Sequence, residues 1–279
     1  MESKKSSKLS NHANSLCRKR MMVMQKKQWI PPSSFEEKLK EYIIPPRFFI
    51  RRIAKREWEK GEKELRWLPF LVDSSRNSVD AGAYRGVYSY YLAQLCRHVY
   101  TFEPNPKMYR ALKRNVARNV TTYPCALSNK TGAAELIVPK KGRRRYSNQM
   151  SSLNAKKADG PHGTVVVQAK RLDDLGLKDI GFMKIDVEGF EQEVLEGARE
   201  TIKASRPNLL VEMEERHTRQ SIEESISQVE QLGYNSFAII GEQLVSIDNF
   251  DPVKNHRNVP AQGDYIFNFI FLPNKAKLL

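Results

Sequence analysis

A glycine loop between an apolar run and an amphipathic stretch constrains the fold of this chain more than any other feature. The loop spans residues 79–89 and reads Val-Asp-Ala-Gly-Ala-Tyr-Arg-Gly-Val-Tyr-Ser. Residues 78–80 resemble the end of a strand, and residues 88–95 have the apolar spacing of a helix. A strand, a glycine loop and a helix in this order are typical of open α/β sheets, which bind ligands at the carboxyl ends of their strands. The sequence therefore predicts a ligand site at this loop.

Short apolar runs alternate with amphipathic stretches through the rest of the chain. The runs predicted as strands are residues 99–102, 121–126, 134–138, 164–167, 182–185, 209–212, 236–240 and 265–271. Helical spacing is found in residues 107–119, 190–204 and 221–232. This alternation predicts an α/β fold with a mostly parallel sheet, doubly wound because parallel crossovers are right-handed. The last strand follows a hairpin-like segment, so we predict that it enters the sheet antiparallel.

Asp80 distinguishes between the cofactors that such a loop can hold. The dinucleotide fingerprint GxGxxG needs a glycine where this chain has Asp80. A carboxylate there would repel a pyrophosphate but suits a ligand with an ammonium and a sulfonium, such as S-adenosylmethionine, so an NAD-dependent oxidoreductase is disfavoured. Glu103 follows about twenty residues later, where an acid can accept hydrogen bonds from ribose hydroxyls. Both carboxylates could instead be helix caps or solvated groups, but their spacing with Gly82 and Gly86 favours the cofactor.

An ordered series of motifs resembles the FkbM-type methyltransferases. The motifs are VDAGAYRGVYS (79–89), FEPNP (102–106), YPCALSNKTG (123–132), RLDDL (171–175), KIDVEGFEQEVLEGA (184–198) and LLVEMEERH (209–217). The resemblance implies a Rossmann-like class I methyltransferase sheet of seven strands, the last one antiparallel. It also implies methyl transfer to oxygen, commonly on hydroxyls of sugars, glycans, glycolipids or natural products. The first seventy-odd residues and the loop at residues 140–145 have no counterpart in it.

The resemblance can be carried over to single positions. Asp80, Gly82 and Gly86 match the cofactor loop, Glu103 matches the ribose acid, and Ala126 matches a position beside the adenine. We predict S-adenosyl-L-methionine as the cofactor. Its predicted binding residues are Asp80, Gly82, Ala83, Tyr84, Gly86, Ser89, Glu103, Asn105, Ala126 and Asp186.

Two carboxylates in the motif at residues 184–189 are the first candidates for catalysis. An alcohol acceptor benefits from a general base within hydrogen-bond reach. This motif ends a predicted strand beside the cofactor loop, and alternation along a strand places Lys184, Asp186 and Glu188 on one side. We predict contact with the donor or acceptor for Asp186 first and Glu188 second. The alternative is that Glu188 and Glu191 only stabilise the first turn of the following helix.

Glu212 and His217 are the remaining catalytic candidates, because they lie at and after the end of the next strand. Histidine titrates in the range of a useful base, although a single loop histidine is commonly just solvated. Carboxylates such as Asp186 and Glu212 can together hold a divalent ion. No ligand spacing demands one, so we predict no metal.

The termini and charge suggest three parts. We expect a flexible basic tail at residues 1–28, a helical N-terminal extension at residues 29–75 and a methyltransferase domain at residues 76–279. Proline pairs in the extension predict two short helices, residues 35–43 and 48–67.

Three scattered cysteines without CxxC pairing argue against a disulfide framework or structural zinc. We expect the protein in the cytoplasm, where it could also contact a membrane peripherally.

The net charge of +15 and the pI of 9.7 favour encounters with polyanions. A basic loop with Lys140, Lys141, Arg143, Arg144 and Arg145 adds to this charge. Simple solvation is one interpretation, and a small-molecule or glycan acceptor that is acidic or lipid-linked, at an anionic membrane, is the other. Nucleic acid is not expected, since no RNA-binding module is found.

Two alternative function classes stay open. An RNA or protein methyltransferase is suggested by the charge, but the Asn-Pro-Pro-Tyr-like motif of base amino-group methylation is missing. A non-catalytic binding module that keeps the fold is disfavoured by the intact set of Asp80, Gly82, Gly86, Glu103 and Asp186.

Overall fold

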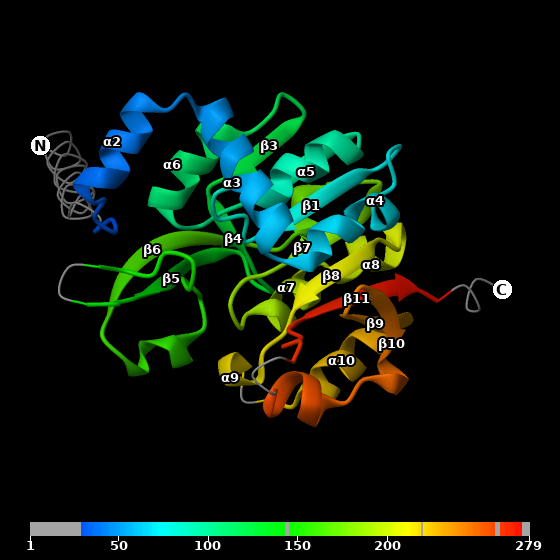
Figure 1. Cartoon of the computed structure of the whole chain (residues 1–279). Coiled ribbons are helices and arrows are strands. Elements are labelled where there is room, and N and C mark those ends of the chain that lie inside the picture. The colour runs from blue at the N-terminus through cyan, green and yellow to red at the C-terminus, as the bar shows by residue number, and fades with distance from the viewer. Residues whose placement is uncertain (1–28, 143–144, 219, 260–262, 275–279) are drawn as a thin grey trace, which may run out of the picture. The chain divides into compact units, whose positions relative to one another are not determined.

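The computed structural model describes residues 29–142, 145–218, 220–259 and 263–274. Within these residues, an eight-stranded sheet has the order β10-β9-β11-β8-β7-β1-β2-β3 (Figure 1). Its strands are β1 Asn77–Ala81, β2 His98–Phe102, β3 Val120–Tyr123, β7 Ile180–Ile185, β8 Asn208–Glu212, β9 Tyr234–Ile240, β10 Gln243–Ser246 and β11 Asn268–Pro273. The predicted flexible basic tail at residues 1–28 lies outside the described residues.

The pairing of the strands confirms the predicted fold class. Strands β3, β2, β1, β7 and β8 pair in parallel, whereas β11 is antiparallel to both β8 and β9. The last strand is therefore antiparallel, as expected. The sheet has one strand more than the seven that the resemblance implied. Residues 241–242 form a tight turn after β9, so the chain folds back as β10 and extends the edge by a hairpin.

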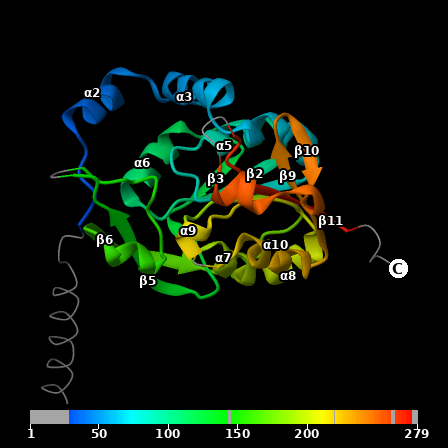
Figure 2. The same ribbon diagram turned by 60° about the horizontal axis from the view of Figure 1, so that its bottom comes forward.

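Helices cover both faces of this sheet (Figure 2). They are α5 Val87–Leu95, α6 Pro106–Asn115, α7 Glu191–Gly197, α8 Arg199–Ser205, α9 Glu215–Thr218 and α10 Ile222–Glu230. Successive residues of β7 point to opposite faces, so Phe182 packs in one cluster with Leu92 of α5. Its neighbour Met183 packs in the other cluster with Val194 of α7 and Ile226 of α10. This two-faced burial makes the sheet doubly wound.

The N-terminal segment is helical and packs on α5. It contains α2 Phe35–Ile43, α3 Pro46–Lys60, the 3₁₀ helix η1 Lys63–Trp67 and α4 Leu68–Leu71. The predicted helix over residues 48–67 is wrong at its end, because α3 stops at Gly61, where a side chain would collide with the backbone of Glu57. The Tyr91 hydroxyl donates a hydrogen bond of 2.9 Å to the carbonyl of Ala54, and Trp58 lies against the Tyr91 ring. The described residues from Pro31 onward belong to one compact unit.

A second, three-stranded sheet stands beside the first. It consists of β4 Cys125–Leu127, β5 Gly132–Pro139 and β6 His162–Lys170 in the order β4-β6-β5. The single strand predicted over residues 121–126 is wrong, since Pro124 divides it. Residues before the proline pair with β2, and residues after it pair with β6. Proline has no N–H to donate to a sheet, so the chain changes sheets there.

Within the described part of the chain, every helix is too short or too polar to cross a membrane.

Candidate active site

A cavity of about 730 Å³ opens where β1, β2, β7 and β8 end at their carboxyl sides. Ligands of open α/β sheets bind at this edge. The predicted site residues that line the cavity are Asp80, Gly82, Ala83, Tyr84, Glu103, Ala126, Asp186, Glu188 and Glu212. The predicted residues that do not line it, among those described, are Gly86, Ser89, Asn105 and His217. The structure thus brings most of the predicted residues to one cavity.

Gly82 allows the loop after β1 to cross the chain after β7. Its φ of +82° is left-handed, and a Cβ atom built there would lie 1.7 Å from the carbonyl oxygen of Asp186. The N–H groups of Gly82 and Ala83 donate to the carbonyl of Phe102 at 3.0 and 3.1 Å. Only glycine fits a left-handed position with so close a backbone. Gly82 therefore fixes the spacing of the two loops that carry Asp80 and Asp186.

Asp80 presents a buried acceptor atom to the cavity. The residue is 1% exposed, and its Oδ2 accepts a 2.5 Å hydrogen bond from the Ser89 hydroxyl. Among the described residues, Oδ1 has no hydrogen-bond partner. Burial raises the pKa of this carboxyl above its ordinary value. A buried polar atom normally has a partner, so Oδ1 fits a ligand that brings a positive charge or a donor. Ser89 acts by orienting Asp80.

Glu103 organises the cofactor loop from the end of β2. Its Oε2 accepts from the N–H of Tyr84 at 2.7 Å, and its Oε1 accepts from the N–H of Asn105 at 2.8 Å. Burial raises the pKa of Glu103 to about 8, and the nearby carboxylates of Asp80 and Asp186 act in the same direction. Each carboxylate oxygen has a second lone pair, so donors such as ribose hydroxyls can still bind.

Asn105 has a structural task that the sequence analysis missed. Its side-chain oxygen accepts from the N–H groups of Lys107 and Met108 at 3.0 and 3.4 Å and thereby caps α6. Asparagine before a proline at the first helical position is the sequence signal for this cap. Asn105 directs the loop that carries Glu103.

Lys184 is a buried cation beneath the cavity and is 2% exposed. Its Nζ lies 2.5 Å from Oδ2 of Asp186 and 4.5 Å from the centre of the Tyr88 ring. Burial opposes the charge, but Asp186, Glu62 and Glu212 outweigh it and raise the pKa of Lys184 above its ordinary value. This ion pair therefore holds the Asp186 side chain in one orientation. Because one of its oxygens is engaged, it is better suited to orient a ligand than to take a proton.

Glu191 shapes the loop that carries Glu188. Its buried Oε1 accepts from the N–H groups of Val187 and Gly189 at 3.1 and 3.0 Å. Burial raises the pKa of Glu191 to about 7. Glu188 has a left-handed φ of +61° and lines the cavity. Glu191 therefore holds the loop before α7 in place and does more than stabilise the first turn of that helix.

His217 lies beside Glu188 although the two are far apart in the sequence. Its Nε2 is 3.6 Å from Oε2 of Glu188. A Cβ atom on Gly189 would lie 2.7 Å from Cβ of His217, so the loop after β7 touches helix α9. The Asn154 side chain joins them by donating to the carbonyls of Gly189 and His217 at 2.9 and 2.8 Å. Glu212 ends β8 next to this pair.

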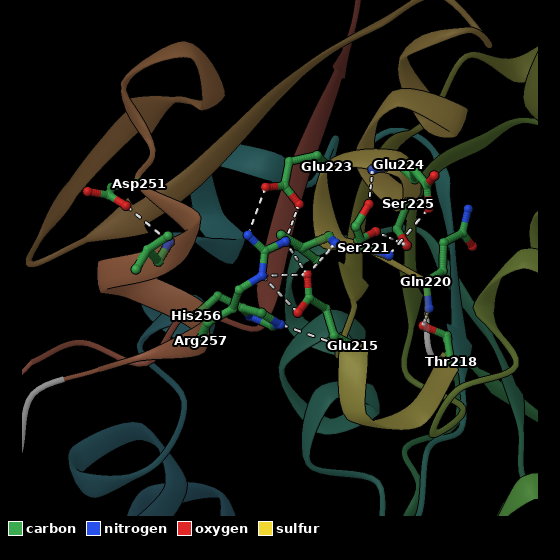
Figure 3. A network of polar contacts seen from close by, with 12 residues as sticks. Glu215, Thr218, Gln220, Ser221, Glu223, Glu224, Ser225, Asp251, His256 and Arg257 are labelled. Atoms are coloured by element: carbon green, nitrogen blue, oxygen red, sulfur yellow. Dashed lines mark hydrogen bonds and ion pairs between the residues drawn. The ribbon is translucent and has the colours of Figure 1, made fainter.

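An ionic network anchors α9, the helix that carries His217 (Figure 3). The Arg257 guanidinium, in the short segment η5 Val253–Arg257, contacts the carboxylates of Glu215 and Glu223. Ser221 and Glu224 form a capping box at the start of α10. These contacts join η5, α9 and α10, so the backbone of His217 is fixed from its outer side.

Comparison with known proteins agrees with this geometry. The model of the methyltransferase FkbM domain matches residues 80–236, more than half of the chain. The chain belongs to the FkbM methyltransferase domain family. Methyltransferase sdnD of Sordaria araneosa is 32% identical in an alignment of 167 residues that covers 48% of this chain and 64% of sdnD. The match thus spans less than two thirds of that relative.

Solved structures are similar to this FkbM-domain chain at low identity. The methyltransferase FkbM of Methylobacillus flagellatus KT is 15% identical with a TM-score of 0.45, over 80% of this chain and 57% of that chain. A TehB-like SAM-dependent methyltransferase of Corynebacterium glutamicum is 11% identical with a TM-score of 0.44, over 82% and 98%. TYW2 of M. jannaschii, solved in complex with AdoMet, is 13% identical with a TM-score of 0.40, over 75% and 72%.

S-adenosyl-L-methionine is the cofactor of this domain family, as the sequence predicted. The unpartnered oxygen of Asp80 and the second lone pairs of the Glu103 carboxylate fit its cationic and ribose groups.

Proposed function

We propose that this FkbM-domain protein transfers a methyl group from S-adenosyl-L-methionine to a hydroxyl oxygen of a sugar, glycan, glycolipid or related metabolite. The observation that carries the proposal is the unpartnered, buried oxygen of Asp80 in a cavity beside the cluster of Glu188, Glu212 and His217. When bound, the cofactor supplies a methyl group to the acceptor oxygen while the C–S bond breaks and its electron pair stays on sulfur.

Binding and proton transfer divide between two groups of residues. Asp80 suits the cationic part of the cofactor, Glu103 its ribose hydroxyls, and buried Ala126 of β4 its adenine side. The acceptor hydroxyl must lose its proton as the new C–O bond forms. Glu188 and His217 are the groups suited to take it, because Asp186 is paired with Lys184.

Basic side chains around the cavity support an acidic acceptor. The buried groups Asp80 and Glu103 are acids, whereas Arg56, Lys141 and Arg216 are bases that also line the cavity. Arg216 and Arg56 form ion pairs with Glu214 and Glu57, and their side chains are exposed by 65% and 70%. Charged groups near an entrance attract ligands of opposite sign and orient them. An acceptor with a uronic acid or phosphate group, free or lipid-linked, fits this distribution.

A membrane contact is part of this proposal. Phe35, Tyr42, Ile43 and Phe48 are exposed on α2 and α3, and α3 also carries several arginines. Aromatic and basic side chains together bind anionic lipid surfaces. Co-sedimentation with vesicles containing phosphatidylserine tests the contact. We expect binding that falls with added salt and after deletion of residues 1–28, and binding unchanged by both would contradict it.

The transfer itself is tested with a cofactor that carries a deuterated methyl group. The full chain is incubated with matched neutral, uronic-acid and phosphorylated sugars, and products are analysed by mass spectrometry. We expect a CD₃ group to replace a hydroxyl proton on the acidic sugars, and a loss of this product in Asp80→Ala. Transfer to RNA or protein side chains and to none of the sugars would refute the proposal.

A further inference from the structure

We propose that Glu188, Glu212 and His217 form a binding site for one divalent transition-metal ion of the Mn²⁺ type. The three residues come from the loop after β7, the end of β8 and helix α9. One ligand atom from each lies within 4.8 Å of the other two. The role of the ion at the acceptor hydroxyl rests on the proposed function, whereas the binding of the ion to these three residues does not.

The distances suit one ion with little rearrangement. Oε2 of Glu188 and Nε2 of His217 are 3.6 Å apart. An ion that bonds each ligand at about 2.1 Å holds ligand atoms about 3 to 4.3 Å apart. The largest separation in the cluster therefore closes with a side-chain movement of about half an ångström.

Glu212 gives independent evidence that the site suits a cation. The residue is 8% exposed and lines the cavity. Among the described residues, no donor or cation contacts its carboxylate within hydrogen-bond or ion-pair distance. The nearest buried cation, Lys184, is already bonded to Asp186. A buried carboxylate without a partner is costly, and a bound cation removes that cost.

The ligand types indicate the class of ion. An imidazole nitrogen suits Fe²⁺ and Zn²⁺ and carboxylates suit Mn²⁺, whereas Mg²⁺ and Ca²⁺ prefer sites made of oxygen alone, so the mixed ligand set favours a transition-metal ion. Two carboxylates and one neutral imidazole balance the charge of a divalent ion to zero. Three protein ligands leave coordination positions open, as in catalytic metal sites.

The surrounding contacts hold the ligands in place. Glu191 orders the loop of Glu188, and Asn154 ties that loop to His217. Such outer contacts orient metal ligands and affect the affinity for the ion. With the ion bound, Nε2 of His217 would be a ligand and not a base, so the proton of the acceptor would go to the carboxylate oxygen of Glu188 that does not bind the ion. An acceptor hydroxyl bound at an open position would lose that proton more readily, because a metal ion stabilises the alkoxide.

Titration with Mn²⁺ tests the site. The full chain is freed of metal with a chelator and titrated with MnCl₂, and free Mn²⁺ is measured by electron paramagnetic resonance. We expect one Mn²⁺ per chain, displaced by Zn²⁺ but not by the same concentration of Mg²⁺. Glu212→Gln and His217→Ala should bind at least about 100-fold more weakly, because even outer-contact changes cost 10- to 100-fold. Glu57→Gln, a carboxylate of the same cavity outside the cluster, should bind like the wild type.

Binding of S-adenosylhomocysteine, measured on the same samples, shows that each variant is folded. If His217→Ala fails this control, Glu188→Gln takes its place. Absence of Mn²⁺ binding in the wild type, or binding equal in the wild type and in the ligand variants, would overturn the metal site. If the chain binds S-adenosylhomocysteine but not Mn²⁺, the metal site is refuted and the proposed function is not. If the chain binds Mn²⁺ but not S-adenosylhomocysteine, the proposed function is refuted and the metal site is not.

Discussion

Replacing Gly82 with alanine is expected to separate the two loops that form the cofactor side of the cavity. The new Cβ would lie 1.7 Å from the carbonyl oxygen of Asp186, and such contacts are not found below 3.0 Å, so one loop must move by about 1.3 Å. A left-handed backbone at a non-glycine residue costs a further 1–2 kcal/mol, roughly. Displacements near 1 Å reduce the function of a site by about 100-fold. We therefore expect the affinity for S-adenosylhomocysteine to fall about 100-fold, which is about 2.7 kcal/mol.

Calorimetric titration measures this loss, and Gly241→Ala separates collision from backbone strain. Gly241 is also left-handed, with a φ of +61°, but a Cβ atom built there would meet open space, with no neighbouring atom within 4 Å. It should lower the melting temperature by about 2–8 °C and leave the affinity unchanged. Binding by Gly82→Ala within about threefold of the wild type, or an equal loss in Gly241→Ala, would refute the reasoning.

Three further predictions concern the same site. Because burial raises the pKa of Glu103 to about 8, its carboxylate ionises as the pH rises through 8. The affinity for S-adenosylhomocysteine, measured by calorimetry, should therefore rise about fivefold from pH 7 to pH 8. The Glu103→Gln variant should show a flatter dependence of affinity on pH. Asn154→Ala removes the bridge between the Glu188 loop and His217 and should weaken Mn²⁺ binding about 10- to 100-fold without changing the affinity for S-adenosylhomocysteine. Arg257→Ala breaks the ion pairs with Glu215 of α9 and Glu223 of α10 and should raise hydrogen exchange in α9 while exchange in β7 stays unchanged; equal exchange in α9 would contradict the anchoring role.

The alternation of strands and helices and the cofactor loop were predictable because they depend on local patterns. Apolar runs, the glycine loop and Asp80 each carry their signal within a few residues. At Pro124 the chain leaves the large sheet and enters the small one. Proline cannot continue the hydrogen bonds of a sheet, so this break was predictable in principle. It was missed because the residues on both sides of Pro124 together resemble one strand. The strand β10 was missed because a four-residue edge strand has little periodicity.

The inner part of the site depended on contacts between distant segments. Glu188 and His217 are separated by a helix pair and a strand, and their proximity depends on Gly189 and Asn154. No ligand spacing in the sequence indicates such a cluster, so the sequence predicts no metal, and the proposed site revises that prediction. Lys184 was placed on the correct side of its strand, but its pairing with Asp186 depends on burial, which the sequence pattern does not specify.

Calorimetric binding of S-adenosyl-L-methionine to the full chain, with NAD as the control, tests the central claim most directly. We predict micromolar binding of S-adenosyl-L-methionine alone, lost in Asp80→Ala, because the cavity then lacks the buried oxygen that suits the cationic part of the cofactor. A folded chain that does not bind S-adenosyl-L-methionine, or that binds NAD equally well, would contradict the assignment of the cavity as a methyl-donor site.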